Sequence, residues 1–274
     1  MPRFAANLSF LFQEVDFPSR FGAAANAGFR AVEFAYPYAF DPRDLAERAR
    51  EHQLEVVLLN APPGDHPAGE RGLASIPGRE RDFAASIDTA LRYADILQCK
   101  RVHVMAGVVP PEADAEERHR RRELYVRHLR HACVRAGEQG VDVLIEPLNG
   151  RDAPGYLLST QADAHAICDD VGLPNLKVQF DLYHAQLVEG DLSGTIRHHL
   201  PQIGHIQVAG VPDRHEPDLG EVHYPWLFRL LDDLGYAGWI GCEYRPLHTT
   251  LAGLGWVRPW LTAAPPPRSR DEAT

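Results

Sequence analysis

The feature of this sequence that most constrains its fold is an alternation, repeated eight times, of a short apolar run with a longer amphipathic stretch. The short runs, which we expect to be strands, are residues 4–9, 31–36, 56–60, 101–106, 142–147, 176–181, 203–209 and 239–244. Helical patterns fill most of the gaps, for example at 17–27, 41–52, 79–97, 116–138 and 224–234. Such an alternation favours β-α-β units, whose strands form a parallel sheet.

The length of the chain fits one closed barrel of these units. A barrel of eight strands and eight helices needs about 250 residues, and this chain has 274, of which 45% are hydrophobic. We therefore predict a single (β/α)8 TIM barrel of the α/β class over residues 1–262. The Pro-rich, charged stretch 263–274 is expected to be a disordered tail. Residues 61–77, rich in Gly and Pro, are too long for a simple turn and are predicted to form a functional loop or lid.

Composition restricts the partners that the protein can have. The formal net charge is -10 and the pI is near 5.8, whereas nucleic acids and anionic membranes are bound by clustered Lys and Arg, so we expect neither partner. The chain shows neither a signal peptide nor an apolar run long enough to span a membrane, which favours a cytoplasmic protein. Cys99, Cys133, Cys168 and Cys242 form no CxxC pair and are expected to be reduced.

Polar residues follow one face of the later predicted strands. Side chains alternate between the two faces of a strand, so one parity points into the barrel and the other toward the helices. The outward parity is apolar: Val143, Ile145, Val178, Phe180, Ile206, Val208, Ile240 and Cys242. The inward parity carries Asp142, Glu146, Lys177, Gln179, Asp181, His205, Gln207 and Glu243. Because a barrel interior is normally filled by branched apolar residues, this lining predicts a charged group among these side chains.

The last inward residue of each strand sharpens this prediction, because the chemistry of TIM barrels lies at the carboxyl ends of the strands. These residues are Asn7, Glu33, Asn60, Glu146, Asp181, Gln207 and Glu243. Three carboxylates and one amide, from four consecutive strands, would meet at the rim and would repel one another unless a cation neutralised them. We therefore predict that Glu146, Asp181, Gln207 and Glu243 bind one divalent metal ion. Oxygen ligands favour Mg2+ or Mn2+ over zinc; any one of the four alone could equally cap a loop or form a local ion pair.

Three further residues are candidates for binding a substrate. His184 follows Asp181 by three residues and is expected at the start of the next loop, over the same mouth, although a lone His is often a structural residue. Arg71 lies in the long loop and Arg214 in the loop after the seventh strand. An acidic protein that binds a carboxylate needs such a cation, although a surface Arg is often only solvated.

The usual nucleotide-binding and hydrolase motifs are absent from the sequence. There is no GxGxxG or GxxxxGK[ST] loop, no GxSxG, and no pair of His at the spacing of a zinc protease. These absences leave the predicted carboxylate centre as the candidate site.

Four motifs in order carry a resemblance to a known family. They are IEPLN at 145–149, FDLYH at 180–184, GHIQ at 204–207 and GCEY at 241–244, and they are supported by RFAANLS at 3–9, AGERG at 68–72, IPGRE at 76–80 and GEVHY at 220–224. With these motifs the chain resembles the xylose-isomerase-like TIM-barrel superfamily. Within it, the chain is most similar to the hydroxypyruvate isomerase family and to its near relative 2-oxo-tetronate isomerase. The resemblance extends from about residue 3 to residue 260.

This resemblance implies an isomerase with a metal cofactor, Mg2+ or Mn2+, and a small hydroxy-carbonyl acid as substrate. The implied reaction interconverts hydroxypyruvate and tartronate semialdehyde (2-hydroxy-3-oxopropanoate) through an enediolate. Glu146 and Glu243 would be the proton donor and acceptor as well as metal ligands, and either could start the reaction. The residues expected to contact the substrate are His184, Arg71, Arg214, Glu70 and Asn7.

Other functions on the same fold stay open at this point. The loop at 210–217 departs from the pattern of the family, so 2-oxo-tetronate isomerase and ketose 3-epimerase are alternatives, although epimerases commonly carry His where this chain has Gln207. A dehydratase or a sugar-acid sensor without catalysis would also fit a metal-bearing barrel. An apurinic endonuclease is disfavoured because it needs more His ligands and a basic groove. A homo-oligomer is possible.

Overall fold

Eight parallel strands close into one barrel in the computed structural model, which describes residues 1–261. The strands are β1 (Arg3–Asn7), β2 (Ala31–Phe34), β3 (Glu55–Asn60), β4 (Arg101–His103), β5 (Asp142–Ile145), β6 (Leu176–Asp181), β7 (Ile203–Val208) and β8 (Trp239–Cys242). Each strand pairs with the next, and β8 pairs with β1 to complete the ring. The predicted single (β/α)8 TIM barrel is thereby confirmed.

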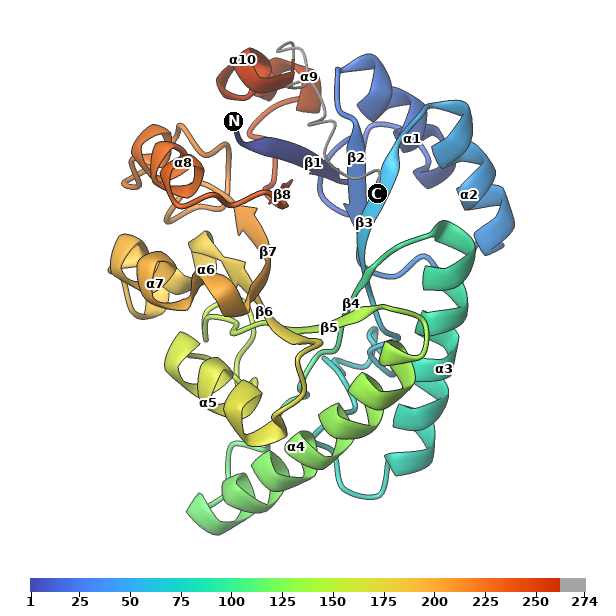
Figure 1. Cartoon of the computed structure of the whole chain (residues 1–274), viewed down its shortest axis with the longest axis vertical. Helices are drawn as coiled ribbons and strands as arrows, with labels where there is room; N and C mark the ends of the chain where they lie inside the picture. Colours follow the sequence, from blue (N-terminus) through green and yellow to red (C-terminus); the bar gives the residue numbers. More distant parts are fainter. Residues whose placement is uncertain (262–274) are drawn as a thin grey trace, which may run out of the picture.

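Helices surround the barrel on its outside (Figure 1). They are α1 (Phe17–Asn26), α2 (Pro42–Glu51), α3 (Glu80–Leu97), α4 (Ala115–Gly137), α5 (Gln161–Val171), α6 (Leu182–Val188), α7 (Leu192–His199), α8 (Tyr224–Asp233), α9 (Thr250–Gly253) and α10 (Arg258–Leu261), with short 3-10 turns at Leu200–Gln202 and Leu254–Trp256. The five helical stretches expected by range agree to within a residue at each end. The predicted tail at 263–274 lies outside the described residues, and no helix within residues 1–261 is both long and apolar enough to cross a membrane.

Short polar side chains start several of these helices. Asp41 accepts a hydrogen bond from the backbone N–H of Arg43, and Thr160 accepts one from that of Asp163. Such caps satisfy donors that the first helical turn leaves without a partner. The same device recurs at Asp181, where it also positions the site described below.

Alternate residues of each strand face two different parts of the interior, the core between sheet and helices and the inside of the barrel. The outward residues Val178, Phe180, Ile206 and Val208 are fully buried in the main core between the sheet and the helices. Inside the barrel a separate small cluster of Ala5, Ala31, Val57 and Trp239 contains the first residues of β2 and β8. The polar inward residues Glu33, Gln179, Asp181, His205 and Gln207 lie further along the strands, toward their carboxyl ends, whereas Asp142 and Lys177 lie at the amino ends of β5 and β6.

The strands end earlier than the sequence suggested. The ladder of β5 stops at Ile145 and that of β8 at Cys242, so Glu146 and Glu243 lie one residue beyond their strands. The alternation of faces continues past the last ladder bond, because both side chains still take part in the polar network of the interior. The prediction from parity therefore survives the shorter strands.

The long loop after β3 is attached to the segment that follows β4. The backbone N–H of Ser75 donates to the carbonyl of Ala106, and that of Gly72 donates to the carbonyl of Pro63. Gly72 has φ +109, and a side chain there would overlap the carbonyl of Met105. Glycine is therefore required where the loop presses on the neighbouring backbone, and Arg71 is carried to this side of the barrel mouth.

Candidate active site

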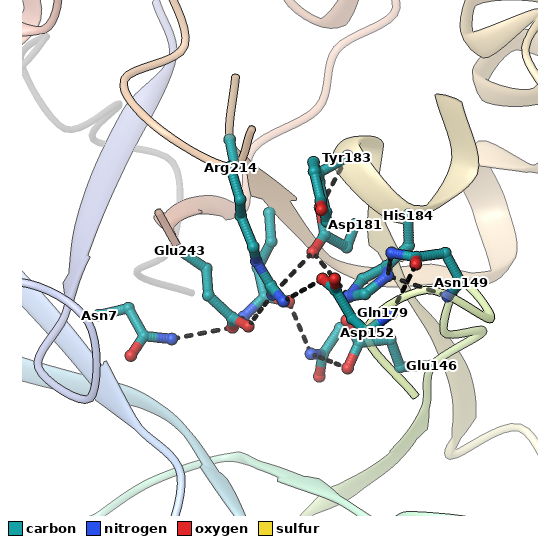
Figure 2. A network of polar contacts seen from close by, with 12 residues as sticks. Asn7, Glu146, Asn149, Asp152, Gln179, Asp181, Tyr183, His184, Arg214 and Glu243 are labelled. Carbon is teal, nitrogen blue, oxygen red and sulfur yellow. Dashed lines mark hydrogen bonds and ion pairs between the residues drawn. The ribbon is translucent and has the colours of Figure 1, made fainter. Parts of the chain in front are cut away.

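The predicted metal ligands come together at the carboxyl end of the barrel. Asp181 ends β6, Gln207 lies on β7, and Glu146 and Glu243 follow β5 and β8. In the register of the sheet Asp181 lies beside Gln207. Figure 2 shows Glu146, Asp181 and Glu243 converging on one region. The structure thus brings together residues that are up to 97 positions apart in the sequence.

Two buried oxygen atoms at this mouth accept no hydrogen bond. They are Oε1 of Glu146 and Oδ2 of Asp181. With His184, these two residues form a group whose potential ligand atoms all lie within 4.8 Å of one another, which is compact enough to hold a metal ion. Buried polar atoms without a partner are rare and point to a bound group. Carboxylate oxygens suit a hard divalent cation, so Glu146 and Asp181 fit the predicted metal.

His184 is placed differently from the prediction, because it lies on helix α6 and not at the start of a loop. The helix begins directly after β6, since Oδ1 of Asp181 caps it by accepting the backbone N–H of Tyr183 at 2.8 Å. A helix of seven residues at this point turns His184 back over the mouth. The capping strength of an Asp in the FDLYH motif was the sequence signal for this helix.

The hydrogen bonds of His184 identify which ring nitrogen carries the proton. Its Nδ1 accepts the backbone N–H of Asn149 at 3.0 Å and lies 2.7 Å from the side-chain Nδ2 of Asn149. Because Nδ1 accepts, a neutral ring carries its proton on Nε2. Burial lowers the pKa of His184 well below its usual value, which keeps the ring neutral. A ring nitrogen that carries a proton cannot bind a metal, so this geometry fits the predicted substrate contact of His184 better than a role as a ligand.

The carboxylates of the site are destabilised as anions. Burial, followed by the charges of Glu243 and Asp181, raises the pKa of Glu146 well above its usual value. Burial also raises the pKa of Asp181 and of Glu243, against the opposing effect of Arg214. A nearby cation would favour the ionised forms. One buried arginine does not balance the two buried carboxylates of Glu146 and Asp181 together with the partly buried one of Glu243, so the site retains a deficit of positive charge.

Arg214 is the cation that the structure itself supplies. Its side chain is 8% exposed, and Nη2 lies 2.6 Å from Oε1 of Glu243 and 3.7 Å from Oδ2 of Asp181, while Nη1 lies 3.0 Å from Asp152. The guanidinium lies 4.9 Å from the ring centroids of both Phe10 and Tyr183. The predicted placement of Arg214 at the mouth is therefore correct. Its charge is already shared among carboxylates of the protein.

Three residues near the carboxylates and Arg214 were not predicted from the sequence. Asp152 lies in the loop after β5, six residues beyond Glu146, and Phe10 lies in the loop after β1. His103 ends β4, and its two ring nitrogens are buried without a hydrogen-bond partner, with Nδ1 3.6 Å from Oε2 of Glu146. Burial lowers the pKa of His103 to about 3, so this ring is neutral. For His103 the available signal was its position at a strand end, whereas the two loop residues gave none.

The loop residues Glu70 and Arg71 are not joined to the carboxylates. Glu70 pairs with Arg79 at 2.5 Å and accepts the backbone N–H of Asp65 at 2.5 Å, so both of its oxygens are used within the loop. Among the residues that the structure describes, Arg71 donates to two backbone carbonyls of its own loop, those of His66 and Glu70. Substrate contact by either residue stays a prediction.

Comparison with known proteins places the chain among its relatives. The sequence profile of the xylose isomerase-like TIM barrel family matches residues 21–260. The chain belongs to this family. As a xylose isomerase-like TIM barrel it is 56% identical to the 2-oxo-tetronate isomerase of Cupriavidus necator over 95% of this chain and 99% of that protein. It is 44% identical to the hydroxypyruvate isomerase of Escherichia coli K12 over 95% of this chain and 100% of that protein.

A solved structure supports the same assignment. A Brucella melitensis protein named as a family 2 AP endonuclease superposes with a TM-score of 0.92 at 47% identity, covering 95% of this chain and 99% of its own. The names of the two curated relatives identify this xylose isomerase-like barrel as an isomerase. The resemblance seen in the sequence is thereby confirmed.

We expect the affinity of the site for Mn2+ to increase with pH. The pKa values of Glu146, Asp181 and Glu243 are raised, so protons occupy these groups at low pH and must leave when the metal binds. By mass action, each proton released changes Kd by up to about tenfold per pH unit. Calorimetric titration at pH 6 and pH 8 should give tighter binding at pH 8. The variant Asp181→Asn should bind weakly at both, and equal wild-type affinities would contradict the expectation.

Proposed function

We propose that this isomerase interconverts hydroxypyruvate and tartronate semialdehyde through an enediolate, with one divalent metal ion, Mg2+ or Mn2+. The observation that carries the proposal is the convergence of Glu146, Asp181 and Glu243 in one mouth, with oxygens of Glu146 and Asp181 left without a hydrogen-bond partner. We assign Glu146, Asp181, Gln207 and Glu243 to the metal. The bound cation would supply the positive charge that stabilises an oxyanion of the substrate.

The two glutamates would transfer the proton. One of them, Glu146 or Glu243, removes a proton from C3 of hydroxypyruvate, and the other returns a proton to C2. The C3 hydroxyl gives up its proton and the C2 oxygen gains one, so that the carbonyl moves from C2 to C3. Burial raises the pKa of both carboxyls, and a raised pKa makes a carboxylate a stronger base toward a C–H proton. His184, with its proton on Nε2, would donate a hydrogen bond to a substrate oxygen.

The substrate carboxylate needs a cation that is not already neutralised. Arg214 contacts Glu243 and Asp152 at hydrogen-bond distance, whereas within residues 1–261 no acidic side chain pairs with Arg71. We therefore assign the carboxylate to Arg71 on the long loop and contacts with the other substrate oxygens to Arg214. Asn7 donates to Glu243, and Glu70 holds the loop through Arg79.

A second candidate is the isomerisation of 2-oxo-tetronate. This acid undergoes the same shift of a carbonyl from C2 to C3, and it differs from hydroxypyruvate only by a hydroxymethyl group on C3. The 56% identity to a 2-oxo-tetronate isomerase, against 44% to the hydroxypyruvate isomerase, favours it. Both reactions require the same proton transfer by the glutamates and the same bound metal ion. Ketose 3-epimerisation is disfavoured, because a neutral sugar would leave Arg71 without an anion.

A substrate panel tests this function. Protein stripped with EDTA and reloaded with Mg2+ or Mn2+ is incubated with hydroxypyruvate, 2-oxo-tetronate and a neutral ketose, and the products are followed by NMR. We expect turnover of one or both acids only after a metal is restored, because the carboxylates require the cation. Faster epimerisation of the ketose, or undiminished turnover by the stripped protein, would refute the proposal.

Replacement of either glutamate should remove most of the activity. In Glu146→Gln and Glu243→Gln the amide cannot accept the substrate proton, and we expect kcat to fall by about 10²- to 10⁴-fold in each. The exposed Glu123→Gln on α4 is the control. Wild-type kcat in either site variant would rule out the role of that residue.

Replacement of Arg71 should affect binding more than chemistry. A hydrogen bond to a charged group is worth about 1.5–3 kcal/mol, so Arg71→Met should raise KM for the acid by about 10- to 100-fold, with a smaller change in kcat. Steady-state kinetics on Arg71→Met and on the surface control Arg118→Met measure this difference. An unchanged KM would show that another group binds the substrate carboxylate.

A further inference from the structure

A carboxylate that the proposed reaction does not use lies below the mouth. Glu33, on β2, is 0% exposed and is surrounded by polar side chains of the neighbouring strands. In the register of the sheet it is paired with Asn7 of β1. The proposed reaction gives Glu33 no contact with the substrate, so its burial requires another explanation.

Glu33 shares two amide donors with Glu243. Nδ2 of Asn7 donates at 2.9 Å to Oε1 of Glu33 and at 2.9 Å to Oε2 of Glu243. Nε2 of Gln207 donates at 2.7 Å to the same oxygen of Glu33 and at 2.5 Å to Oε2 of Glu243. Each NH2 group therefore spans the two carboxylates and has no further proton to give.

Two neighbouring residues, His205 and Gly241, fix the position of Glu33. Nε2 of His205 lies 2.6 Å from its Oε2, and Gly241 of β8 faces it. A Cβ atom at position 241 would overlap both oxygens of the Glu33 carboxylate. The glycine of the GCEY motif therefore leaves the space that this carboxylate fills.

The difference between a carboxylate and a side-chain amide decides how the amides of Asn7 and Gln207 are oriented. A side-chain amide can turn by 180° with little change in shape, which exchanges its NH2 group for its oxygen. An ionised carboxylate only accepts hydrogen bonds, so Glu33 favours the orientation in which the NH2 groups of Asn7 and Gln207 face it. In that orientation the same groups also face Glu243. A turned amide would direct an oxygen at Glu243 instead.

The orientation extends to the second glutamate. With its NH2 group toward Glu33, Gln207 directs Oε1 at Nε2 of Gln179, 2.7 Å away. That nitrogen also donates to Oε2 of Glu146 at 3.0 Å. A continuous series of hydrogen bonds therefore joins Glu33 to both proton-transfer groups.

We propose that Glu33 is a positioning residue that, through the amides of Asn7 and Gln207, fixes the orientation of Glu243 for proton transfer. The inference rests on the proposed function for its effect on turnover, whereas its structural part does not. Glu33 touches neither the substrate nor the reacting atoms, and Gly241 is required because any side chain there would displace it.

The variant Glu33→Gln tests the proposal with little change in volume. Both amides donate to Oε1 of Glu33 and His205 lies against Oε2, so the NH2 group introduced at position 33 must face either the amides, one of which then turns, or His205, whose ring then accepts on Nε2. In both cases the charge that favours the present orientation of the two NH2 groups is lost. We expect kcat for the acid that proves to be the substrate to fall by about 10- to 100-fold, as is typical when a residue supporting an active-site group is removed. KM should stay within about threefold of the wild-type value. Gly241→Ala should reproduce the loss without altering any hydrogen-bonding group. Glu216→Gln, which removes another buried carboxylate, should keep wild-type kcat.

A double-mutant cycle separates positioning from a general structural role. If Glu33 acts through Glu243, adding E33Q to the E243Q variant should lower the residual kcat less than twofold, because interacting sites are not additive. An equal loss of kcat in both backgrounds, or wild-type kcat in E33Q, would overturn the proposal.

Neutron crystal structures of the wild type and of E33Q, in which amide nitrogen and oxygen can be told apart, give a readout that does not depend on the substrate. We expect the amide of Gln207 or Asn7 to be turned, or Glu243 to be displaced. Unchanged contacts of all three would overturn the inference even if the substrate panel had failed, so the two failures can be told apart.

Discussion

The mutual repulsion of buried carboxylates is the constraint on which the rest of this site depends. Glu146 and Asp181 are buried and Glu243 is partly buried, and the buried guanidinium of Arg214 beside them does not neutralise all three. Their pKa values are raised as a result. A group of acids in this state favours a divalent cation and can also exchange protons with a substrate, and the proposed function uses the same electrostatic imbalance for both.

One side chain of this group, that of Asp181, has two structural roles. One oxygen of Asp181 caps helix α6, which fixes the carboxylate, and the other lies at the mouth without a hydrogen bond, 3.7 Å from Nη2 of Arg214. Helix α6 in turn carries His184, whose ring is oriented by Asn149. Isomerases acting on different acids can share such a frame, because the fold fixes the carboxylates while loops can vary. In the proposed function the loop bearing Arg71 binds the carboxylate of the substrate.

Most of the fold could be predicted from the sequence, because period and parity are local properties. A strand exposes alternate residues to each face whatever its neighbours are, so the polar parity of β6 to β8 is enough to identify Asp181 and Gln207 as residues of the barrel mouth. Strand ends were less predictable, since a ladder stops where its partner strand stops; β5 and β8 are accordingly shorter than expected. Helix α6 was missed because its cap, Asp181, was interpreted only as a ligand.

The sequence by itself determined the barrel, the rim position of Glu146, Asp181, Gln207 and Glu243, and the presence of cations in the flanking loops. Only the tertiary structure decided what lies between them. The placement of Asp152 against Arg214 and the sharing of amide hydrogens between Glu33 and Glu243 depend on contacts across strands and loops far apart in the chain. Side-chain orientation is set by hydrogen-bond partners in space, and no periodicity along the chain encodes which partners those will be.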